Sequence, residues 1–561
     1  MVVDINRMEA GIMGEIRPNP DSIRTANPQT YPQYPFNSPP KIRESSQPIY
    51  GIRAETDQMV RVRDGIRLAL DVFRPAGQPG DKFPALLGFS PYTRQLQQTD
   101  VPLGQNEAGI KEFWVPRGYA MVCVDVRGSN DSEGGWDLYG PTEQADLADI
   151  IEWAGSQPWC TGSVGMVGAS YYGRTQLMAA EQQPPSLKAI FAYDAATDAY
   201  RDAFFHGGIP SEGMQRTWLA AVYALNMQSG RLKNRAAMLE KITTVVGLKY
   251  PLDCQFYQER SAWPHLDRIK IPTYFGCHWG FWNLHLRGAF SGWMGINGIP
   301  KRMLVGPEPH PRRPVAEYHQ ETLRWYDYWL KGMDTGVMDG PPIQLWIRGE
   351  NTWRSENEWP LARTDWRELY LGGPSSGLEG TLDWSSASTG ERGYDYVPDS
   401  NDWLWGRPRL VYRTQRLERA LEITGPVQLD LWITSTAKDT DFLVVLSDEF
   451  PDGSVSVMTK GWLRASHRAV DPKRSQPNQP WHPHTGLELL TPGEPVLLPI
   501  EVISTCNVFK PGHRVRLEIA SCDNMAENPF GYHRSLLNSA RNAILEGGKH
   551  ASKLRVPVIP R

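Results

Sequence analysis

The chain has 561 residues, a net charge of −4 and 40% hydrophobic residues, a composition typical of a globular protein. This length is too great for a single core, so we expect two or three domains. No long basic stretch suggests a nucleic-acid partner, and no run approaches the roughly 18 apolar residues of a membrane span. Residues 1–20 carry charges where a signal peptide would have its apolar core, which predicts a cytoplasmic protein.

The six cysteines are scattered without paired spacing, so we expect neither a disulfide framework nor a zinc site. His482 and His484 have the spacing of metal ligands. No further ligand supports them, and a loop is the better interpretation. The sequence therefore predicts no metal and no cofactor.

Residues 1–50 are rich in Pro, Asn, Gln and Ser without periodicity, which predicts an extended N-terminal arm. Beyond it, alternating apolar residues flank the hairpin signal Asp64-Gly65. Apolar runs of buried-strand type then alternate with segments of helical spacing, the first of which has Thr142 as its expected cap. Strands that alternate with helices predict a parallel α/β sheet. The runs lie at residues 83–89, 119–126, 188–193, 272–276 and 301–306.

Residues 200–263 interrupt this alternation with a helical pattern that contains no buried strand. Because the segment leaves and rejoins the sheet at strand ends, we interpret it as a helical cap over the active site rather than a surface excursion. The α/β domain would then comprise residues 51–199 and 264–355. From residue 356 to 561, short alternating strands separated by turn residues predict an all-β sandwich.

The stretch from Val164 to Gly173, VGMVGASYYG, combines a strand, a sharp turn and a helix. An apolar run ends at Gly168 and a helical pattern begins after Ser170, as a nucleophile elbow requires. The turn would expose the Ser170 hydroxyl and leave the Tyr171 amide at a helix N-terminus, where it can donate to a developing oxyanion. Ser170 is therefore the predicted nucleophile of a hydrolase.

A serine nucleophile needs a neighbouring base, and His310 is the best placed of the twelve histidines. It follows an apolar strand at 303–305, and the base of such hydrolases follows the last sheet strand. His278 and His285 come after the preceding strand and are expected to line the pocket. His319 lies in the next helical pattern, and we interpret it as structural.

Several motifs together make the chain resemble the family of cocaine esterase, α-amino acid ester hydrolase and X-prolyl dipeptidyl peptidase. The resemblance covers nearly everything from residue 58 onward. It implies an α/β-hydrolase core, an inserted helical cap and a C-terminal jelly roll. It also implies that Tyr92 supplies its phenol to the oxyanion hole beside the Tyr171 amide. The motifs are Pro91-Tyr92, DVRGS at 125–129, SEG at 132–134, GASYYG at 168–173, WLKG at 329–332 and FKPGHRVRL at 509–517.

The sequence departs from this family at the third member of the catalytic triad. The family places an aspartate just after the penultimate core strand, but residues 276–285 read GCHWGFWNLH. An alignment on the glycine and the aromatic residues puts Asn283 at the acid position, and an ungapped alignment puts Phe281 there. No acidic residue occurs between Asp267 and Glu308.

The group that orients His310 therefore stays open. Asp194 and Asp198 follow the run 189–193, whose strand should lie beside the strand that ends near Gly276. Asp198 could instead cap the helical insertion. Asn283 or a backbone carbonyl is the alternative orienting group. We do not expect Glu308 in this role, because a residue only two positions from His310 on a loop seldom faces the same imidazole.

The sequence predicts a serine hydrolase that cleaves a carboxylic ester, or alternatively an amide, through an acyl-enzyme on Ser170. An X-prolyl dipeptidyl aminopeptidase would need a carboxylate for the free amine of its substrate, and the sequence identifies none. A non-catalytic ligand-binding homologue is the alternative from another class, because the usual triad aspartate is absent. The expected partner is a small-molecule ester or amide substrate, and homo-oligomer formation stays open.

Overall fold

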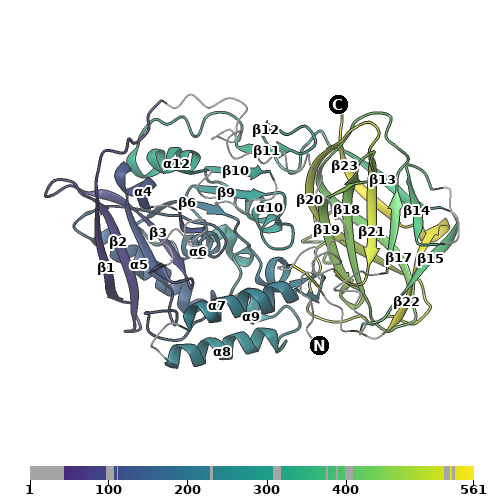
Figure 1. Cartoon of the computed structure of the whole chain (residues 1–561), viewed down its shortest axis with the longest axis horizontal. Helices are drawn as coiled ribbons and strands as arrows, with labels where there is room; N and C mark the ends of the chain where they lie inside the picture. The colour runs from purple at the N-terminus through teal and green to yellow at the C-terminus, as the bar shows by residue number, and fades with distance from the viewer. Residues whose placement is uncertain are drawn as a thin grey trace, which may run out of the picture.

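The computed structural model describes residues 43–95, 107–109, 111–227, 232–307, 318–373, 377–386, 389–398, 408–523, 531–533, 537 and 539–561. His310, Glu308 and the expected arm up to residue 42 lie outside these described residues. Figure 1 shows two bodies side by side, a sheet flanked by helices in the N-terminal part and a body of strands in the C-terminal part. Among the described residues, no helix is both long and apolar enough to cross a membrane.

The N-terminal sheet contains ten strands within the described residues, in the order β1-β2-β4-β3-β5-β6-β9-β10-β11-β12. All pairings from β4 to β11 are parallel, whereas β1, β2 and β12 pair antiparallel at the edges. The predicted parallel α/β sheet is confirmed. The strands are β1 (Ile52–Arg61), β2 (Arg67–Pro75), β3 (Phe83–Ser90), β4 (Ala120–Asp125), β5 (Cys160–Met166), β6 (Leu187–Tyr193), β9 (Thr273–His278), β10 (Lys301–Gly306), β11 (Ile343–Ile347) and β12 (Thr352–Glu356).

Helices cover this sheet, and every residue of β3 and β4 is buried. Parallel strands that are covered on both faces require such continuous apolar runs. Helix α5 begins at Pro141 with Gly140 as its N-cap, so the expected cap at Thr142 is wrong. Proline at the first helical position already has a helical φ and lacks an N–H that would need a partner. The helices are α4 (Lys111–Trp114), α5 (Pro141–Ser156), α6 (Tyr171–Glu181), α10 (Leu286–Gly295) and α12 (His319–Lys331).

The segment between β6 and β9 is helical, as the sequence pattern predicts, and it also contains the two-residue strands β7 and β8 that periodicity does not indicate. Helices α7 and α8 lie along one edge of the N-terminal body in Figure 1. The elements are η3 (Ala199–Phe204), β7 (Phe205–His206), β8 (Ile209–Pro210), η4 (Gly213–Trp218), α7 (Leu219–Asn226), α8 (Leu232–Val246), α9 (Gln255–Gln258) and η5 (Trp263–Arg268).

The C-terminal body is all-β, as predicted. Its sheet contains eleven strands within the described residues, in the order β15-β22-β17-β20-β19-β18-β21-β16-β14-β13-β23, and an additional β17–β23 pairing closes it. The strands are β13 (Asp365–Gly372), β14 (Glu379–Asp383), β15 (Thr389–Tyr396), β16 (Arg409–Arg413), β17 (Leu421–Ser435), β18 (Asp441–Glu449), β19 (Val455–Arg464), β20 (Val496–Phe509), β21 (Arg514–Ala520), β22 (Ala540–Gly547) and β23 (Lys553–Ile559).

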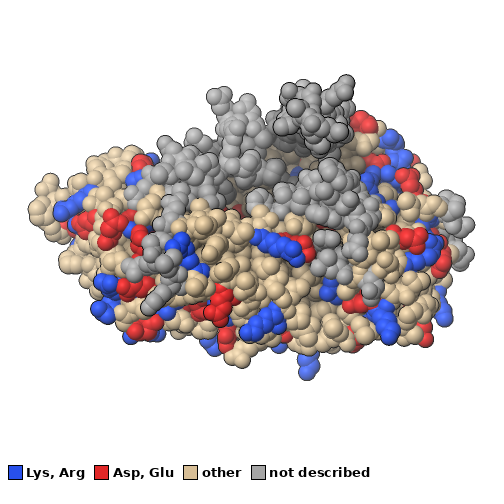
Figure 2. Space-filling model, turned by 60° about the horizontal axis from the view of Figure 1, so that its bottom comes forward, with Lys and Arg blue, Asp and Glu red and all other residues tan. Residues whose placement is uncertain are grey.

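Buried polar contacts join the two bodies. Arg348, which follows β11, donates from Nε to the Cys506 carbonyl in β20 at 2.9 Å. Arg287 in α10 forms an ion pair with Glu501 at 3.1 Å. On the face shown in Figure 2, basic and acidic side chains are interspersed, in keeping with the small net charge of −4.

Candidate active site

Ser170 lies at the turn between β5 and α6, with φ 60° and ψ −114°. A positive φ is strained for a residue other than glycine, so the surrounding structure must hold it. On one side, the Ala169 N–H donates to the Glu107 carbonyl at 2.6 Å; on the other, the Ser170 N–H donates to the Tyr193 carbonyl at 3.1 Å. The elbow expected from the sequence is therefore anchored on one side to the segment between β3 and β4 and on the other to the end of β6.

Two glycines of the motif have no room for a side chain. A Cβ on Gly168, whose φ is +119°, would lie 2.6 Å from the Glu107 carbonyl oxygen. A Cβ on Gly173 would lie 2.2 Å from the Tyr193 carbonyl oxygen. Both distances are far below van der Waals contact. The spacing of glycines around Ser170 thus follows from the close approach of the elbow to its neighbours.

The hydroxyl of Tyr171 is engaged by two other side chains and does not contact the nucleophile through a described hydrogen bond. Its hydroxyl donates to Glu143 Oε1 at 2.6 Å and accepts a hydrogen bond from Trp136 Nε1 at 3.3 Å. Its backbone N–H, by contrast, is the first of α6, and the first N–H groups of a helix have no partner within the helix. The backbone amide is therefore the part of Tyr171 that is suited to an oxyanion.

Tyr92 lies in the loop after β3, with 5% of its surface exposed. Its hydroxyl accepts a hydrogen bond from Trp218 Nε1 at 2.9 Å. Burial raises the pKa of the Tyr92 phenol well above its ordinary value, and hydrogen bonds with Trp218 and Ser170 oppose this shift. The phenol therefore keeps its proton beside Ser170. The structure brings together these two residues, which are far apart in the sequence.

Asp194 follows β6 directly, and β6 pairs with β9 as the sequence analysis expects. Its φ is 47°, and its N–H donates to the Gly276 carbonyl at 2.7 Å. One carboxyl oxygen, Oδ2, lies 3.7 Å from Nε2 of His278. The other, Oδ1, is buried without a hydrogen-bond partner among the described residues. Burial raises the pKa of Asp194 to about 8.

Asp198 caps the first helix of the insertion, in agreement with its structural interpretation from the sequence. Its Oδ1 accepts hydrogen bonds from the N–H groups of Tyr200 and Arg201, both at 2.9 Å. Its Oδ2 pairs with the Arg201 guanidinium at 2.9 Å. These contacts engage both carboxylate oxygens. Asn283 is buried in the turn before α10, with 8% of its surface exposed.

The histidines singled out from the sequence lie in different settings. His278 ends β9, and its ring lies 4.4 Å from that of Phe281. His319 begins α12 and stacks on Phe113 at 4.4 Å, in keeping with a structural position. His484 lies in a loop, and its Nδ1 is 3.0 Å from Nδ1 of His467. His310, the proposed base, falls in the segment after β10 outside the described residues.

A small cavity of about 20 Å³ adjoins Ser170. Side chains of the helical insertion form part of its wall, and His285 lines it as expected. Sequence reasoning missed Arg174, although its position four residues after Ser170 puts both on one face of α6. It also missed Trp218, Glu107 and Glu143, which no motif marks. The cavity is lined by Tyr139, Ser170, Arg174, Ala196, Ala203, Phe204, Met214, Trp218, Leu284 and His285.

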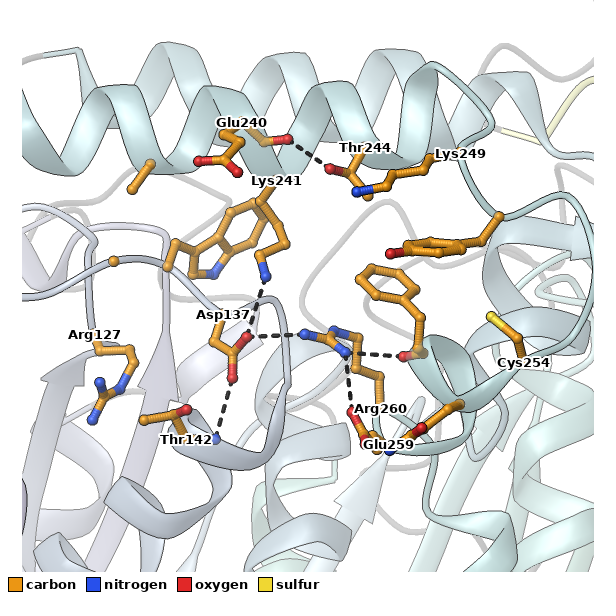
Figure 3. Close-up of a pocket in the computed structure, with 16 residues that line it drawn as sticks. Arg127, Asp137, Thr142, Glu240, Lys241, Thr244, Lys249, Cys254, Glu259 and Arg260 are labelled. Carbon is orange, nitrogen blue, oxygen red and sulfur yellow. Dashed lines mark hydrogen bonds and ion pairs between the residues drawn. The ribbon is translucent and has the colours of Figure 1, made fainter.

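A larger cavity of about 810 Å³ lies between α8 and the start of α5, and Ser170 is not among its lining residues. Figure 3 shows that the side chains of Lys241 and Arg260 point toward Asp137. Asp137 forms ion pairs with Lys241 at 3.3 Å and with Arg260 at 2.9 Å, and it accepts a hydrogen bond from the Thr142 N–H at 3.2 Å. Trp136 lines this cavity and also donates to the Tyr171 hydroxyl, so it separates the cavity from the elbow.

Glu107 beneath the elbow should make the stability of the fold depend on pH. Burial, with a smaller contribution from the charge of Asp194, raises its pKa to about 8. The ordinary value is about 4.3, so the folded chain keeps a proton that the unfolded chain releases between about pH 4 and pH 8. The contribution of Glu107 to the free energy of unfolding is therefore fully present below about pH 4 and is lost as the pH rises toward 8.

We expect Glu107→Gln, which is neutral at every pH, to flatten this decline. Thermal unfolding from pH 5 to 9 should show the variant gaining on the parent as the pH rises. The exposed Glu494→Gln is the matched control and should follow the parent. A Glu107→Gln curve parallel to that of the parent would contradict a buried, protonated Glu107.

Comparison with known proteins places this geometry in a family. Residues 64–312 match the X-Pro dipeptidyl-peptidase (S15 family), and residues 335–555 match the X-Pro dipeptidyl-peptidase C-terminal non-catalytic domain. Cocaine esterase from Rhodococcus sp. is 27% identical over 593 residues, covering 90% of this chain and 98% of that protein.

Solved structures give the same result. A CocE/NonD family hydrolase from Staphylococcus aureus is 25% identical with a TM-score of 0.77, covering 94% of this chain and 100% of that one. An α-amino acid ester hydrolase shares the fold with a TM-score of 0.70 at 19% identity, covering 93% of this chain and 100% of that one. The chain belongs to the serine hydrolase family that includes cocaine esterase and the X-Pro dipeptidyl-peptidases.

Proposed function

We propose that this chain hydrolyses a carboxylic ester, with an amide as the alternative substrate, through an acyl-enzyme on Ser170. One observation carries the proposal. A serine in a strained turn lies beside a buried, protonated phenol and at the N-terminus of a helix. Such an arrangement supplies a nucleophile together with two donors for the oxyanion of the tetrahedral intermediate.

In the proposed reaction, Ser170 Oγ attacks the carbonyl carbon while its proton passes to the imidazole of His310. The Tyr92 phenol and the Tyr171 N–H donate hydrogen bonds to the oxyanion that forms. Collapse of the intermediate breaks the bond to the alcohol, which takes the proton from the imidazole. Water then adds to the acyl carbon by the same route, releasing the carboxylic acid and free Ser170.

We assign the orientation of the histidine to Asp194. Ser170 and Asp194 follow β5 and β6, and His278 ends β9; these strands are neighbours in the parallel sheet, so their carboxyl ends meet at one edge. In the sequence, His310 comes four residues after the end of the next strand, β10. Asp198 is engaged by its helix cap and its ion pair, whereas Asp194 Oδ1 has no hydrogen-bond partner among the described residues. The acid of the triad would then follow β6 in this chain, whereas the family usually carries it after the strand that corresponds to β9.

The helical insertion is suited to act as a cap over the substrate. Phe204, Met214 and Trp218 from this segment line the cavity at Ser170. Trp218 also holds the phenol of Tyr92 through a hydrogen bond from its indole. We further propose that the closed C-terminal sheet is a jelly roll that supports the cap, since the Arg201 guanidinium in the insertion donates to the His482 carbonyl at 3.0 Å.

A fluorophosphonate probe tests the proposal, because it reacts with an activated serine and spares an unactivated one. We expect stoichiometric labelling of the wild-type protein at Ser170, mapped by mass spectrometry of the labelled peptide. A folded protein that stays unlabelled and hydrolyses no ester would instead favour the non-catalytic homologue.

Tyr92→Phe should lower kcat by about a hundred- to a thousand-fold, which is the usual loss when one oxyanion donor is removed. The ring and its packing are kept, so the thermal midpoint should change little. Tyr412→Phe provides a matched control, because this buried tyrosine also donates a hydrogen bond, to Glu546 at 2.9 Å, in the C-terminal sheet. If Tyr92→Phe turned over ester as fast as Tyr412→Phe, Tyr92 would only line the pocket.

A further inference from the structure

The cavity that adjoins Ser170 also contains a buried positive charge. Arg174 lies four residues after the nucleophile on α6 and lines the same cavity, with 4% of its surface exposed. Its guanidinium donates to the Arg260 carbonyl and lies 4.3 Å from the centre of the Tyr139 ring. Its Nε is buried and has no hydrogen-bond partner among the described residues.

No carboxylate within the described part of the chain forms an ion pair with Arg174. Asp202 and Asp198, two carboxylates whose charges oppose the lowering of the Arg174 pKa by burial, are engaged elsewhere. Asp202 pairs with Arg287 at 3.0 Å, and Asp198 pairs with Arg201 at 2.9 Å. A buried charge without an opposite charge beside it is costly, so buried charges are usually paired. A ligand that carries the opposite charge would remove this cost at Arg174.

A second nitrogen group lines the same cavity. His285 is buried, with 4% of its surface exposed, and its Nδ1 has no hydrogen-bond partner among the described residues. Burial, together with the charge of Arg174, lowers the pKa of His285 to about 3, so its ring is neutral. A neutral imidazole can donate one hydrogen bond to an acceptor that the guanidinium also contacts.

The carboxyl groups closest to the elbow do not cancel the charge of Arg174. Burial raises the pKa of Glu107, Glu143 and Asp194 to about 8 in each case. All three are therefore largely protonated at pH 7. None of them lines the cavity at Ser170, so the charge that a bound acyl group meets there is positive.

We propose that Arg174, assisted by His285, binds a carboxylate on the acyl part of the substrate, so that the preferred esters are monoesters of short dicarboxylic acids. This inference rests on the proposed esterase function and specifies its substrate class. The cavity of about 20 Å³ has roughly the space of one water molecule, so even a short acyl chain enters only if side chains of the insertion shift outward. A guanidinium presents parallel N–H donors that match a carboxylate, which fixes the acyl group with its ester carbonyl at Ser170.

The same charge disfavours a cationic acyl group. A dipeptidyl peptidase or an amino acid ester hydrolase must accommodate a free ammonium group near the scissile bond. Among the residues that the structure describes, no Asp or Glu lines the cavity, and the ammonium would instead face the Arg174 guanidinium. Like charges in a poorly solvated site repel strongly. Aminoacyl substrates should therefore be poor ones.

Three methyl esters of nearly equal size separate these cases. Methyl butyrate, monomethyl succinate and β-alanine methyl ester end in a methyl, a carboxylate and an ammonium group, respectively. We expect the wild-type kcat/KM, measured by titration of released acid at constant pH 7, to be about 10- to 100-fold higher for the succinate ester than for the butyrate ester. The β-alanine ester should be the slowest of the three.

Arg174→Met keeps the aliphatic contact with Tyr139 and removes the charge. Its preference for the succinate ester over methyl butyrate should disappear, mainly through a higher KM for the succinate ester. Arg174→Lys should retain part of the preference. Arg216→Met is the matched control, because this side chain of the insertion is 54% exposed and does not line the cavity.

Binding to Ser170→Ala, measured by calorimetry, tests the inference without turnover. Monomethyl succinate should bind about 10-fold or more tightly than methyl butyrate, and adding Arg174→Met should abolish the difference. Equal binding, or a wild-type preference that survives Arg174→Met, would overturn the role of Arg174. Failure of fluorophosphonate labelling with the binding difference intact would overturn the esterase function alone.

Discussion

Ser170→Ala is expected to lower ester turnover by about a million-fold, the loss seen when the nucleophile of a serine hydrolase is removed. The fold should survive, because the substitution deletes one hydroxyl from a turn that its neighbours hold. Ala169 and Ser170 are anchored by hydrogen bonds of their backbone N–H groups to the carbonyls of Glu107 and Tyr193, and alanine keeps both. The residue at 170 keeps its strained φ of 60° in either case.

Initial rates with a p-nitrophenyl ester, together with labelling by a fluorophosphonate, measure this effect. Ser447→Ala is the matched control, since this serine in β18 is buried and its hydroxyl has no partner among the described residues. The control should keep both turnover and labelling. Turnover by Ser170→Ala above a few percent of the parent would mean that another residue attacks the substrate.

Much of the fold can be predicted from the sequence because its signals are local. Strands such as β3 and β4 are almost continuous apolar runs, since both of their faces are buried. The elbow also has a local signal, because the motif has glycine at 168 and 173, where the backbones of Glu107 and Tyr193 approach too closely for a side chain. The wrong cap predicted for α5 also has a local cause. Threonine is a commoner N-cap than glycine, which favours Thr142 over Gly140, but Pro141 is suited to the first position of the helix and places the cap at Gly140.

The contents of the site are less predictable, because they depend on contacts between distant segments. Trp218 donates to the hydroxyl of Tyr92, 126 positions away in the sequence, and no motif relates the two. Glu107 contacts the elbow through its carbonyl, which accepts a hydrogen bond from the Ala169 N–H, and no motif relates these two residues either. Arg174 is the exception, since the helical period alone places it on the face of α6 that carries Ser170. Its missing counter-charge, however, is visible only in three dimensions.

Asp194→Asn is expected to lower kcat by about ten-thousand-fold, the loss seen when an amide replaces the acid of a serine triad. Asparagine has the same shape as aspartate and tolerates the positive φ of 47° at this position, so the backbone should stay in place. The amide cannot stabilise the imidazolium that forms during acyl transfer. The loss should therefore appear in kcat far more than in the thermal midpoint.

The dependence of kcat/KM on pH identifies the group. Burial raises the pKa of Asp194 to about 8, so its carboxylate, and with it the activity, should appear as the pH rises through about 8. Asp194→Asn should lack this rise. Asp198→Asn keeps an oxygen that can cap the helix but loses the ion pair with Arg201, so it should instead lower the thermal midpoint and keep the rise.

Two further substitutions show which histidine Asp194 serves. His278 Nε2 lies 3.7 Å from Asp194 Oδ2, too far for a hydrogen bond in the absence of substrate but close enough for a pair of charges. If His310 is the base, His310→Asn should abolish turnover, whereas His278→Asn should reduce it only modestly. Asn283→Asp adds a carboxylate where an alignment with the family expects one, and a gain in turnover would show a vacated position. If Asp194→Asn and Asn283→Asp both turn over ester like the parent, no carboxylate orients the base, because Asp198 is already engaged by its cap and its ion pair.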